Sequence, residues 1–385
     1  MILNMSKQEN KICEHCNKKF SISDGELSLY EKIGIELPVI CFFCRVKLHL
    51  SFWLFGKFRK GKSDFSGEDL ITVLPEKNRY PIYTLHEWHS DAWDAMDYGQ
   101  DYDSSKSFFA QLQELQEKVP HPHQNGAKNT GCDWCDDVWN SKNCYLSRSM
   151  EECEDLYYSY RNFRVKNSID VVVCFESERC FDSVNCHHSY KTFYSRNSRD
   201  CVDSYFLQDC RNCQNCFMSW NLRNKKYCIL NQQYAKEDYF KKIEEYNLQS
   251  RDSIEKLKKE LWQHTQQDAV HRQDYNVKVA NSSGNFLDNN KGCFESYFLQ
   301  ESENCRYIYR GFGNKETVDS VGVFRTEKCG MCTMDQFGSY GNICNLYTTS
   351  CRYSAYLDAC EECEYCFGCV GLRNKKYCIL NKQYT

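Results

Sequence analysis

Small and apolar residues recur at a fixed 21-residue interval through the middle of the chain. One such series consists of Cys132, Cys153, Cys174, Ser195 and Cys216. The residues between them vary among charged, amide and tyrosine side chains, which indicates an inside and an outside. At roughly 3.3 Å per residue such a coil has a perimeter of about 70 Å, with equivalent residues stacked about 4.8 Å apart. The pattern predicts a mainly β fold with helical insertions, built on a β-solenoid of about 21 residues per coil.

The Cys-rich pattern occurs twice. The sequence LRNKKYCILN at 222–231 recurs unchanged at 372–381, and the preceding cysteines are repeated with the same shift. An identical run at a fixed shift establishes an internal duplication. We therefore expect two solenoid arrays, at 131–234 and 285–385. The second is expected to contain a bulged coil, because the spacings from Cys329 to Cys351 and from Cys344 to Cys366 exceed the 21-residue interval by one.

Helix-like spacing of apolar residues is found in two segments outside the arrays. The first has Ser104 or Ser105 as its expected N-cap, ends at Pro120, and carries one apolar stripe: Phe108, Phe109, Leu112, Leu115 and Val119. The second, 236–267, is charged with apolar residues at helical intervals. We expect an irregular aromatic segment plus a helix at 63–130 and a helical insertion at 235–284, following an N-terminal domain at 1–62.

Cysteine supplies 27 of the 385 residues. Whether these thiols are reduced or form disulfides depends on the redox compartment in which the protein resides. The chain opens without an apolar signal segment, and its longest apolar stretch, near 48–55, is too short to span a bilayer. We therefore expect a cytoplasmic protein with no membrane contact, in which the thiols are reduced and some of them bind metal.

Two cysteine pairs near the N-terminus have the spacing of a metal site. Cys13 and Cys16 form one C-x2-C pair, and Cys41 and Cys44 form another after a long spacer. Each pair can hold one side of a metal, and the spacer is long enough to return the second pair and complete a tetrahedron. Four thiolates with no open position predict one structural Zn²⁺ in a zinc ribbon. Iron in a rubredoxin-like site would use the same spacing.

The repeats contain other cysteines that bear on metal chemistry. Cys360, Cys363, Cys366 and Cys369 are each three apart, and this run is an alternative metal site, although it lacks the longer last gap and proline of ferredoxin cluster-binding runs. A site of two cysteines and two histidines near 121–135 is a further alternative. The simplest interpretation of the stacked cysteines is that they pack as small hydrophobic residues.

Charge is uneven along the chain. Residues 1–62 hold 11 Lys/Arg against 6 Asp/Glu, a net of +5, so the remainder carries −9 of the total of −4. The segment 45–62 combines basic and aromatic side chains without an acid, a composition suited to phosphate contacts and base stacking. The expected nucleic-acid-binding residues are Arg45, Lys47, Trp53, Lys57, Arg59 and Lys60. A solvated basic surface, or one that docks on the acidic remainder, is the alternative.

Several longer motifs give the chain a family resemblance. They are FSISDGELSLYEKIGIELPVICFFCR, WHSDAWDAMDYGQDYD, SKNCYL, and NLRNKKYCILNQQY followed by KEDYFKKIEEY. With these motifs the chain resembles a family of cysteine-rich zinc-ribbon proteins with duplicated Cys-rich repeats, common in candidate-phyla bacteria. The resemblance implies a zinc ribbon on Cys13, Cys16, Cys41 and Cys44, and the family offers no established activity that could be carried over to this chain.

The sequence presents no nucleophile–base pair, phosphate-binding glycine loop or HExxH site. We therefore expect a non-enzymatic zinc-binding scaffold or interaction protein whose basic ribbon contacts a protein, a nucleic acid or a ribonucleoprotein, with no small-molecule substrate identified. The alternative is a metal-binding or redox protein that uses the stacked cysteines of the repeats.

Overall fold

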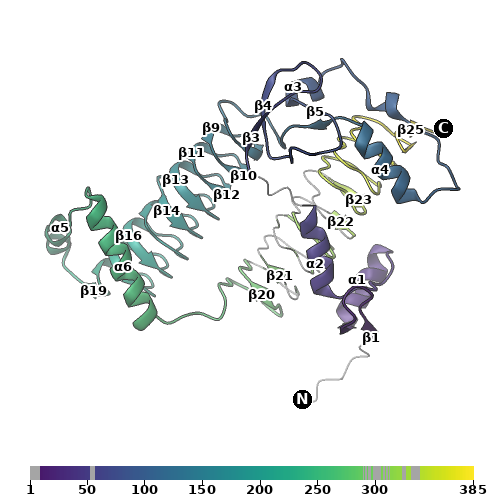
Figure 1. Cartoon of the computed structure of the whole chain (residues 1–385). Helices are drawn as coiled ribbons and strands as arrows, with labels where there is room; N and C mark the ends of the chain where they lie inside the picture. The colour runs from purple at the N-terminus through teal and green to yellow at the C-terminus, as the bar shows by residue number, and fades with distance from the viewer. Residues whose placement is uncertain are drawn as a thin grey trace. The chain divides into compact units, whose positions relative to one another are not determined.

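The computed structural model describes residues 9–52, 57–288, 290, 293, 296–297, 305–306, 308, 311, 313–322, 327–330 and 339–385. The fold is mainly β, as the sequence predicts, and it divides into two compact units (Figure 1). Unit 1 combines Met1–His123 with Asp274–Thr385, and unit 2 is Gln124–Gln273. The N-terminal segments therefore belong with the second Cys-rich array, and the helical insertion belongs with the first.

The elements of unit 1 are short. Its N-terminal part contains β1 (Glu9–Ile12), β2 (Lys19–Ile22), α1 (Asp24–Ile33), α2 (Phe42–Ser51), β3 (Arg59–Lys62), β4 (Asp69–Thr72), β5 (Ile82–Tyr83), α3 (Leu85–Trp88), the 3₁₀ helix η1 (Ala95–Tyr98), α4 (Phe108–Lys118) and β6 (His121–Pro122). Its C-terminal part contains β20 (Gly284–Asn285), β21 (Ser296–Tyr297), β22 (Glu327–Cys329), β23 (Tyr340–Asn342), β24 (Cys378–Ile379) and β25 (Lys382–Gln383).

Unit 2 is one 13-stranded sheet followed by two helices. Its elements are β7 (Gly126–Ala127), β8 (Asp136–Trp139), β9 (Lys142–Tyr145), β10 (Arg148–Glu151), β11 (Glu154–Tyr157), β12 (Tyr160–Phe163), β13 (Lys166–Val172), β14 (Phe181–Val184), β15 (Tyr190–Phe193), β16 (Val202–Gln208), β17 (Gln214–Trp220), β18 (Lys226–Ile229), β19 (Gln232–Gln233), α5 (Lys236–Glu244) and α6 (Arg251–Gln267).

From β7 to β18 the strands of unit 2 pair in parallel with a constant 12-residue offset, and β19 closes the sheet by pairing antiparallel with β18. Asp136 pairs with Arg148, which pairs with Tyr160, and the same offset continues to Gln214 and Lys226. Figure 1 shows these strands stacked side by side. The 21-residue coil predicted from the sequence is therefore wrong, and the structure has a 12-residue repeat.

The error has a simple cause in the burial pattern. From Cys135 to Ser219 every third residue is buried, so each 12-residue repeat contributes four inward side chains. Because 21 is a multiple of three, the 21-residue series selects inward positions correctly. It does not identify the strand-pairing offset.

Inward side chains satisfy the backbone as well as fill the core. The Ser147 hydroxyl donates to the Tyr145 carbonyl at 2.9 Å and accepts from the Ser159 N–H at 3.1 Å. The Cys360 thiol lies 3.4 Å from each of two main-chain carbonyl oxygens. The inward positions therefore favour small side chains that can donate, and serine and cysteine both meet this requirement.

The chain turns a corner at every third residue. Those residues have positive φ, and Asn and Asp occupy many of them, in keeping with their tolerance of this conformation. Asn185 and Asn197 are one repeat apart and hydrogen-bond through their side chains at 2.8 Å. Val173, one repeat before Asn185, has φ 55°, which is unfavourable for a β-branched residue.

The expected helical insertion consists of α5 and α6, separated at 245–250. Their apolar faces cover the end of the 13-stranded sheet, where Tyr239 and Leu257 pack with Phe206, Phe217 and Ile229. The amphipathic pattern of 236–267 thus predicted both the helices and a buried face.

The C-terminal repeats of unit 1 follow the same rule. Bridges from Tyr340–Arg352 to Phe367–Ile379 all have the 12-residue offset. Earlier in this part, the offset is shorter by one where Val277 pairs with Asp288, and longer by one where β22 pairs with β23. Outward residues stack from one repeat to the next: the rings of Tyr353 and Tyr365 are 5.1 Å apart. The irregular coil predicted for this array is therefore a local change of offset.

The C-terminal repeats are covered by the segment expected to be irregular. Trp88 and Trp93 pack with Leu112 and Leu115 of α4 against the buried cysteines of 351–378. The N-cap of α4 is Ser107, not Ser104 or Ser105, and its predicted stripe is only partly buried, with Phe109 62% exposed. The segment also begins with an ordered hairpin, β3–β4, so the boundary expected at residue 62 falls inside a hairpin.

Within the described part of the chain, every helix is too short or too polar to cross a bilayer.

We predict that Val173→Asn stabilises unit 2. Asparagine relieves the unfavourable backbone conformation, by about 1 kcal/mol, and adds a rung to the Asn185–Asn197 ladder. The matched control is Val172→Asn, at an adjacent strand position without positive φ, which should lower stability. Thermal and denaturant unfolding of the two variants check the prediction, and it is contradicted if both substitutions destabilise the protein equally.

Candidate metal centre

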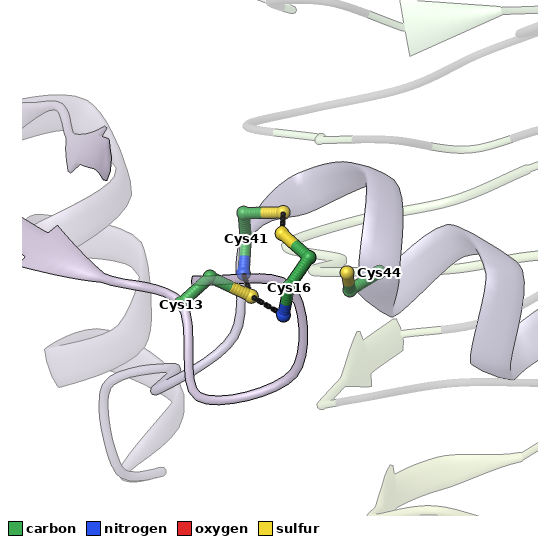
Figure 2. Close-up of side chains that lie close together, drawn as sticks. All are labelled: Cys13, Cys16, Cys41 and Cys44. Carbon is green, nitrogen blue, oxygen red and sulfur yellow. Dashed lines mark hydrogen bonds between the residues drawn. The ribbon is translucent and has the colours of Figure 1, made fainter. Parts of the chain in front are cut away.

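Two structural elements present the two pairs of N-terminal cysteines. Cys13 and Cys16 lie in the turn that follows β1, where the Cys13 N–H donates to the Lys18 carbonyl at 2.9 Å. Cys41 is the N-cap residue of α2, and Cys44 lies in its first turn. A tight turn and a helix N-terminus thus face each other (Figure 2). The turn positions Cys13 and Cys16, and the start of α2 positions Cys41 and Cys44.

The four sulfur atoms all lie within 4.8 Å of one another. The sulfurs of Cys16 and Cys41 are 3.7 Å apart. Four sulfurs at about 2.3 Å from a tetrahedral Zn²⁺ would lie about 3.8 Å from one another. The Cys13 sulfur also accepts the N–H groups of Cys16 at 3.4 Å and Cys41 at 3.2 Å. The cluster can hold a metal ion, and its backbone donors favour thiolate at Cys13.

The thiols of this cluster differ in acidity. Burial opposes ionisation of Cys13, but backbone N–H groups outweigh it and lower its pKa from 9.0 to about 6. Burial and the neighbouring thiols raise the pKa of Cys44 to about 12. Without a cation the four groups do not all ionise at neutral pH, so their full ionisation depends on a positive charge among them.

Arg45, which follows the last of these cysteines, is buried. Its Nε donates to Asp319 at 2.9 Å, and a terminal nitrogen lies 3.5 Å from Glu26. The Tyr30 hydroxyl donates to the same Asp319 carboxylate at 2.5 Å, and burial together with that charge raises the pKa of Tyr30. Arg45 therefore attaches the segment that carries Cys13, Cys16, Cys41 and Cys44, the four-cysteine module, to the C-terminal repeats. The expectation that Arg45 contacts nucleic acid is wrong.

The other residues expected to bind nucleic acid are in different environments. Lys47, Lys57 and Lys60 are exposed. Arg59 is half-buried, and its guanidinium donates to the Leu74 carbonyl at 2.7 Å. Trp53 lies outside the described residues. Three of the six predicted residues thus keep a free surface.

The alternative metal site in the repeats is not assembled. Among residues that the structure describes, the N-terminal cysteines are the one group of three or more candidate ligands whose ligand atoms all lie within 4.8 Å of one another. Cys360, Cys363, Cys366 and Cys369 are buried core residues, and each thiol donates to a main-chain carbonyl two residues before it. The histidines considered with Cys132 and Cys135 are also engaged: His121 contacts Asp358 at 3.3 Å, and His123 accepts from the Leu85 N–H at 3.0 Å.

Sequence reasoning missed the groups that surround Arg45. Asp319 is far from Arg45 along the chain, and no local pattern marks it. Glu26 carried a usable signal, because Ser23 and Glu26 form a capping box at the start of α1.

We predict that Arg45→Met destabilises unit 1, because it leaves the buried carboxylates of Asp319 and Glu26 without their cation. Removing one partner of such a pair costs about 3–5 kcal/mol. Lys47→Met, on the exposed side of the same helix, is the control and should change stability by less than about 0.5 kcal/mol. Denaturant unfolding measures both effects. Equal stability of the two variants would show that Arg45 has no structural role.

Comparison with known proteins does not assign the chain to a family. No family model matches it, and no curated protein is similar to it. One solved structure with a weak match is that of a putative acetyltransferase from Desulfovibrio desulfuricans G20, with 10% identity and a TM-score of 0.11. The match covers 64% of this chain and 63% of that one, so the chain spans less than two thirds of that protein's length. The resemblance to cysteine-rich zinc-ribbon proteins therefore stays a prediction.

Proposed function

We propose that the protein is a non-enzymatic cytoplasmic scaffold in which one structural Zn²⁺ bound by Cys13, Cys16, Cys41 and Cys44 folds the N-terminal module, while β-solenoid arrays form an extended framework. The observation that carries the proposal is the closed set of four sulfurs within 4.8 Å. Four protein thiolates saturate a tetrahedral ion and leave no position for a substrate, which is typical of structural zinc.

The burial of the repeat cysteines supports a division of roles. Their thiols donate to main-chain carbonyls in positions that serine occupies elsewhere in the repeats, so they contribute packing and hydrogen bonds. This favours the scaffold over a redox protein that uses the stacked cysteines.

The experiment that tests the zinc site is elemental analysis of the full chain purified without oxygen. We expect one zinc per chain, lost in Cys13→Ser/Cys16→Ser. The control is Cys363→Ser/Cys366→Ser, which alters two buried cysteines at positions where serine should be tolerated, and it should keep the zinc. Iron in place of zinc, or metal lost only in the control, would contradict the proposal.

We further propose that the scaffold contacts a nucleic acid through the basic residues that remain exposed, Lys47, Lys57 and Lys60. The excess of +5 in residues 1–62 and the exposure of these lysines support it. Arg45 and Arg59 take no part, since each is bonded within the protein. A contact of this kind depends on phosphate charge and is weakened by salt.

We predict salt-dependent binding to a short single-stranded RNA or duplex DNA, measured by fluorescence anisotropy. Three phosphate contacts give a log–log salt slope of about −2 to −3, or roughly a 15- to 60-fold loss of affinity between about 50 and 200 mM salt. Lys47→Ala/Lys57→Ala/Lys60→Ala should abolish this dependence. Lys77→Ala/Lys106→Ala/Lys118→Ala, at exposed positions of the same unit, is the control and should retain it. Equal binding by both triple variants would reject the proposed surface and favour a protein partner.

A further inference from the structure

The hairpin β3–β4 repeats the hairpin β1–β2 pair by pair. Adding 50 to each residue number in the register of the first hairpin gives the register of the second. The turn between the strands also matches: the Cys13 N–H donates to Lys18 at 2.9 Å, and the Ser63 N–H donates to Glu68 at 2.8 Å. A further N–H in each turn is also equivalent, because those of Cys16 and Ser66 point to the side chains of Cys13 and Ser63 at 3.4 and 3.5 Å.

Residues Asn17 and Gly67 complete the match between the two turns. They have φ of 58° and 77°, and their N–H groups donate to the carbonyls of Cys13 and Ser63 at 2.8 and 3.0 Å. Ser63 and Ser66 therefore occupy the positions of Cys13 and Cys16.

The second halves of the two modules also correspond. Cys41 is the N-cap of α2 with φ −68° and ψ 162°, and Thr84 is the N-cap of α3 with φ −62° and ψ 156°. Cys44 lies three residues after the N-cap Cys41, and Glu87 lies three residues after the N-cap Thr84.

Backbone hydrogen bonds hold the helix start to the hairpin in the same way in both modules. The Glu14 N–H donates to the Val39 carbonyl at 3.1 Å, and the Asp64 N–H donates to the Ile82 carbonyl at 2.9 Å. Each carbonyl lies two residues before the N-cap. The four ligand positions of the first module are therefore Ser63, Ser66, Thr84 and Glu87 in the second.

In the second module a buried carboxylate connects the equivalent positions by hydrogen bonds. Glu87 is 7% exposed, and its Oε2 accepts the Ser63 hydroxyl at 2.5 Å and the Thr84 N–H at 2.8 Å. The Glu87 N–H in turn donates to the Thr84 hydroxyl at 3.3 Å. Burial opposes ionisation of Glu87, but hydrogen bonds from Ser63, Ser66 and Thr84 outweigh it and lower its pKa to about 2.

We infer that residues 59–88 are a second copy of the four-cysteine module that folds without metal, because the hydrogen-bonded cluster of Ser63, Ser66, Thr84 and Glu87 replaces the metal–thiolate bonds. The same frame should accept a tetrahedral Zn²⁺ when these four side chains are changed to cysteine. The comparison with a zinc site rests on the zinc proposed for the first module. The hydrogen-bonded geometry of residues 59–88 does not depend on that zinc.

The replacement matters for how the protein responds to metal loss. Trp88 follows Glu87 directly, and it packs with Trp93 against the buried cysteines of the C-terminal repeats. Its indole N–H also donates to the Pro120 carbonyl at 3.1 Å. A hydrogen-bonded copy keeps this packing in place when the first module loses its metal.

The test introduces Ser63→Cys/Ser66→Cys/Thr84→Cys/Glu87→Cys into the full chain and measures zinc per chain after growth in zinc. The control, Phe65→Cys/Glu68→Cys/His86→Cys/Asp91→Cys, adds four thiols at exposed positions, three within the same module and one three residues after it. We expect two zinc ions per chain in the first variant and one in the control and the wild type. A first variant that is folded by circular dichroism and holds no more zinc than the control overturns the inference.

Hydrogen exchange of the wild type decides the matter if the fourfold variant does not fold. After treatment with a strong chelator, amides at 9–22 should lose protection while amides at 59–72 retain it. Loss of protection in both segments overturns the inference. A wild type that holds no zinc rejects the proposed function alone, and the inference then predicts one zinc in the fourfold variant against none in the control.

Discussion

The core of the repeats has room for one small side chain at every third residue, and this constraint governs most of the structure. Four such side chains per 12-residue repeat face one another and the main-chain carbonyls around them. Serine and cysteine fit because they are small and carry a donor, and larger apolar residues are used sparingly. An unusual abundance of cysteine therefore follows from packing, and it requires no metal in the repeats.

The same constraint separates two kinds of cysteine. In the repeats the thiols hydrogen-bond to main-chain carbonyl oxygens. The sulfurs of Cys13, Cys16, Cys41 and Cys44 instead lie within 4.8 Å of one another. The gathering is produced by a turn and a helix start that recur in the second module. There the same frame holds a buried carboxylate, so one backbone arrangement accommodates both a four-thiolate cluster that can hold a metal ion and a hydrogen-bonded cluster.

Local features were predictable from the sequence, and long-range ones were not. The two C-x2-C pairs and the amphipathic segment at 236–267 carry their information within short spans, and the structure places them as expected. The repeat length was misjudged because cysteine, serine and apolar residues alternate at inward positions. Residues of one kind therefore recur at a multiple of the three-residue spacing, and 21 residues is such a multiple although the strands pair at an offset of 12. Arg45 was assigned to a basic surface because its partner, Asp319, is brought beside it only by the fold.

The central claim is that a single closed set of four thiolates binds the metal and that the repeat cysteines the structure describes pack as small core residues. X-ray absorption at the zinc edge of the intact protein tests it most directly. The account predicts one shell of four sulfur atoms at about 2.3 Å with no metal–metal scattering. Nitrogen or oxygen ligands in that shell would contradict the four-thiolate site, and a second metal at short distance would contradict a single metal ion.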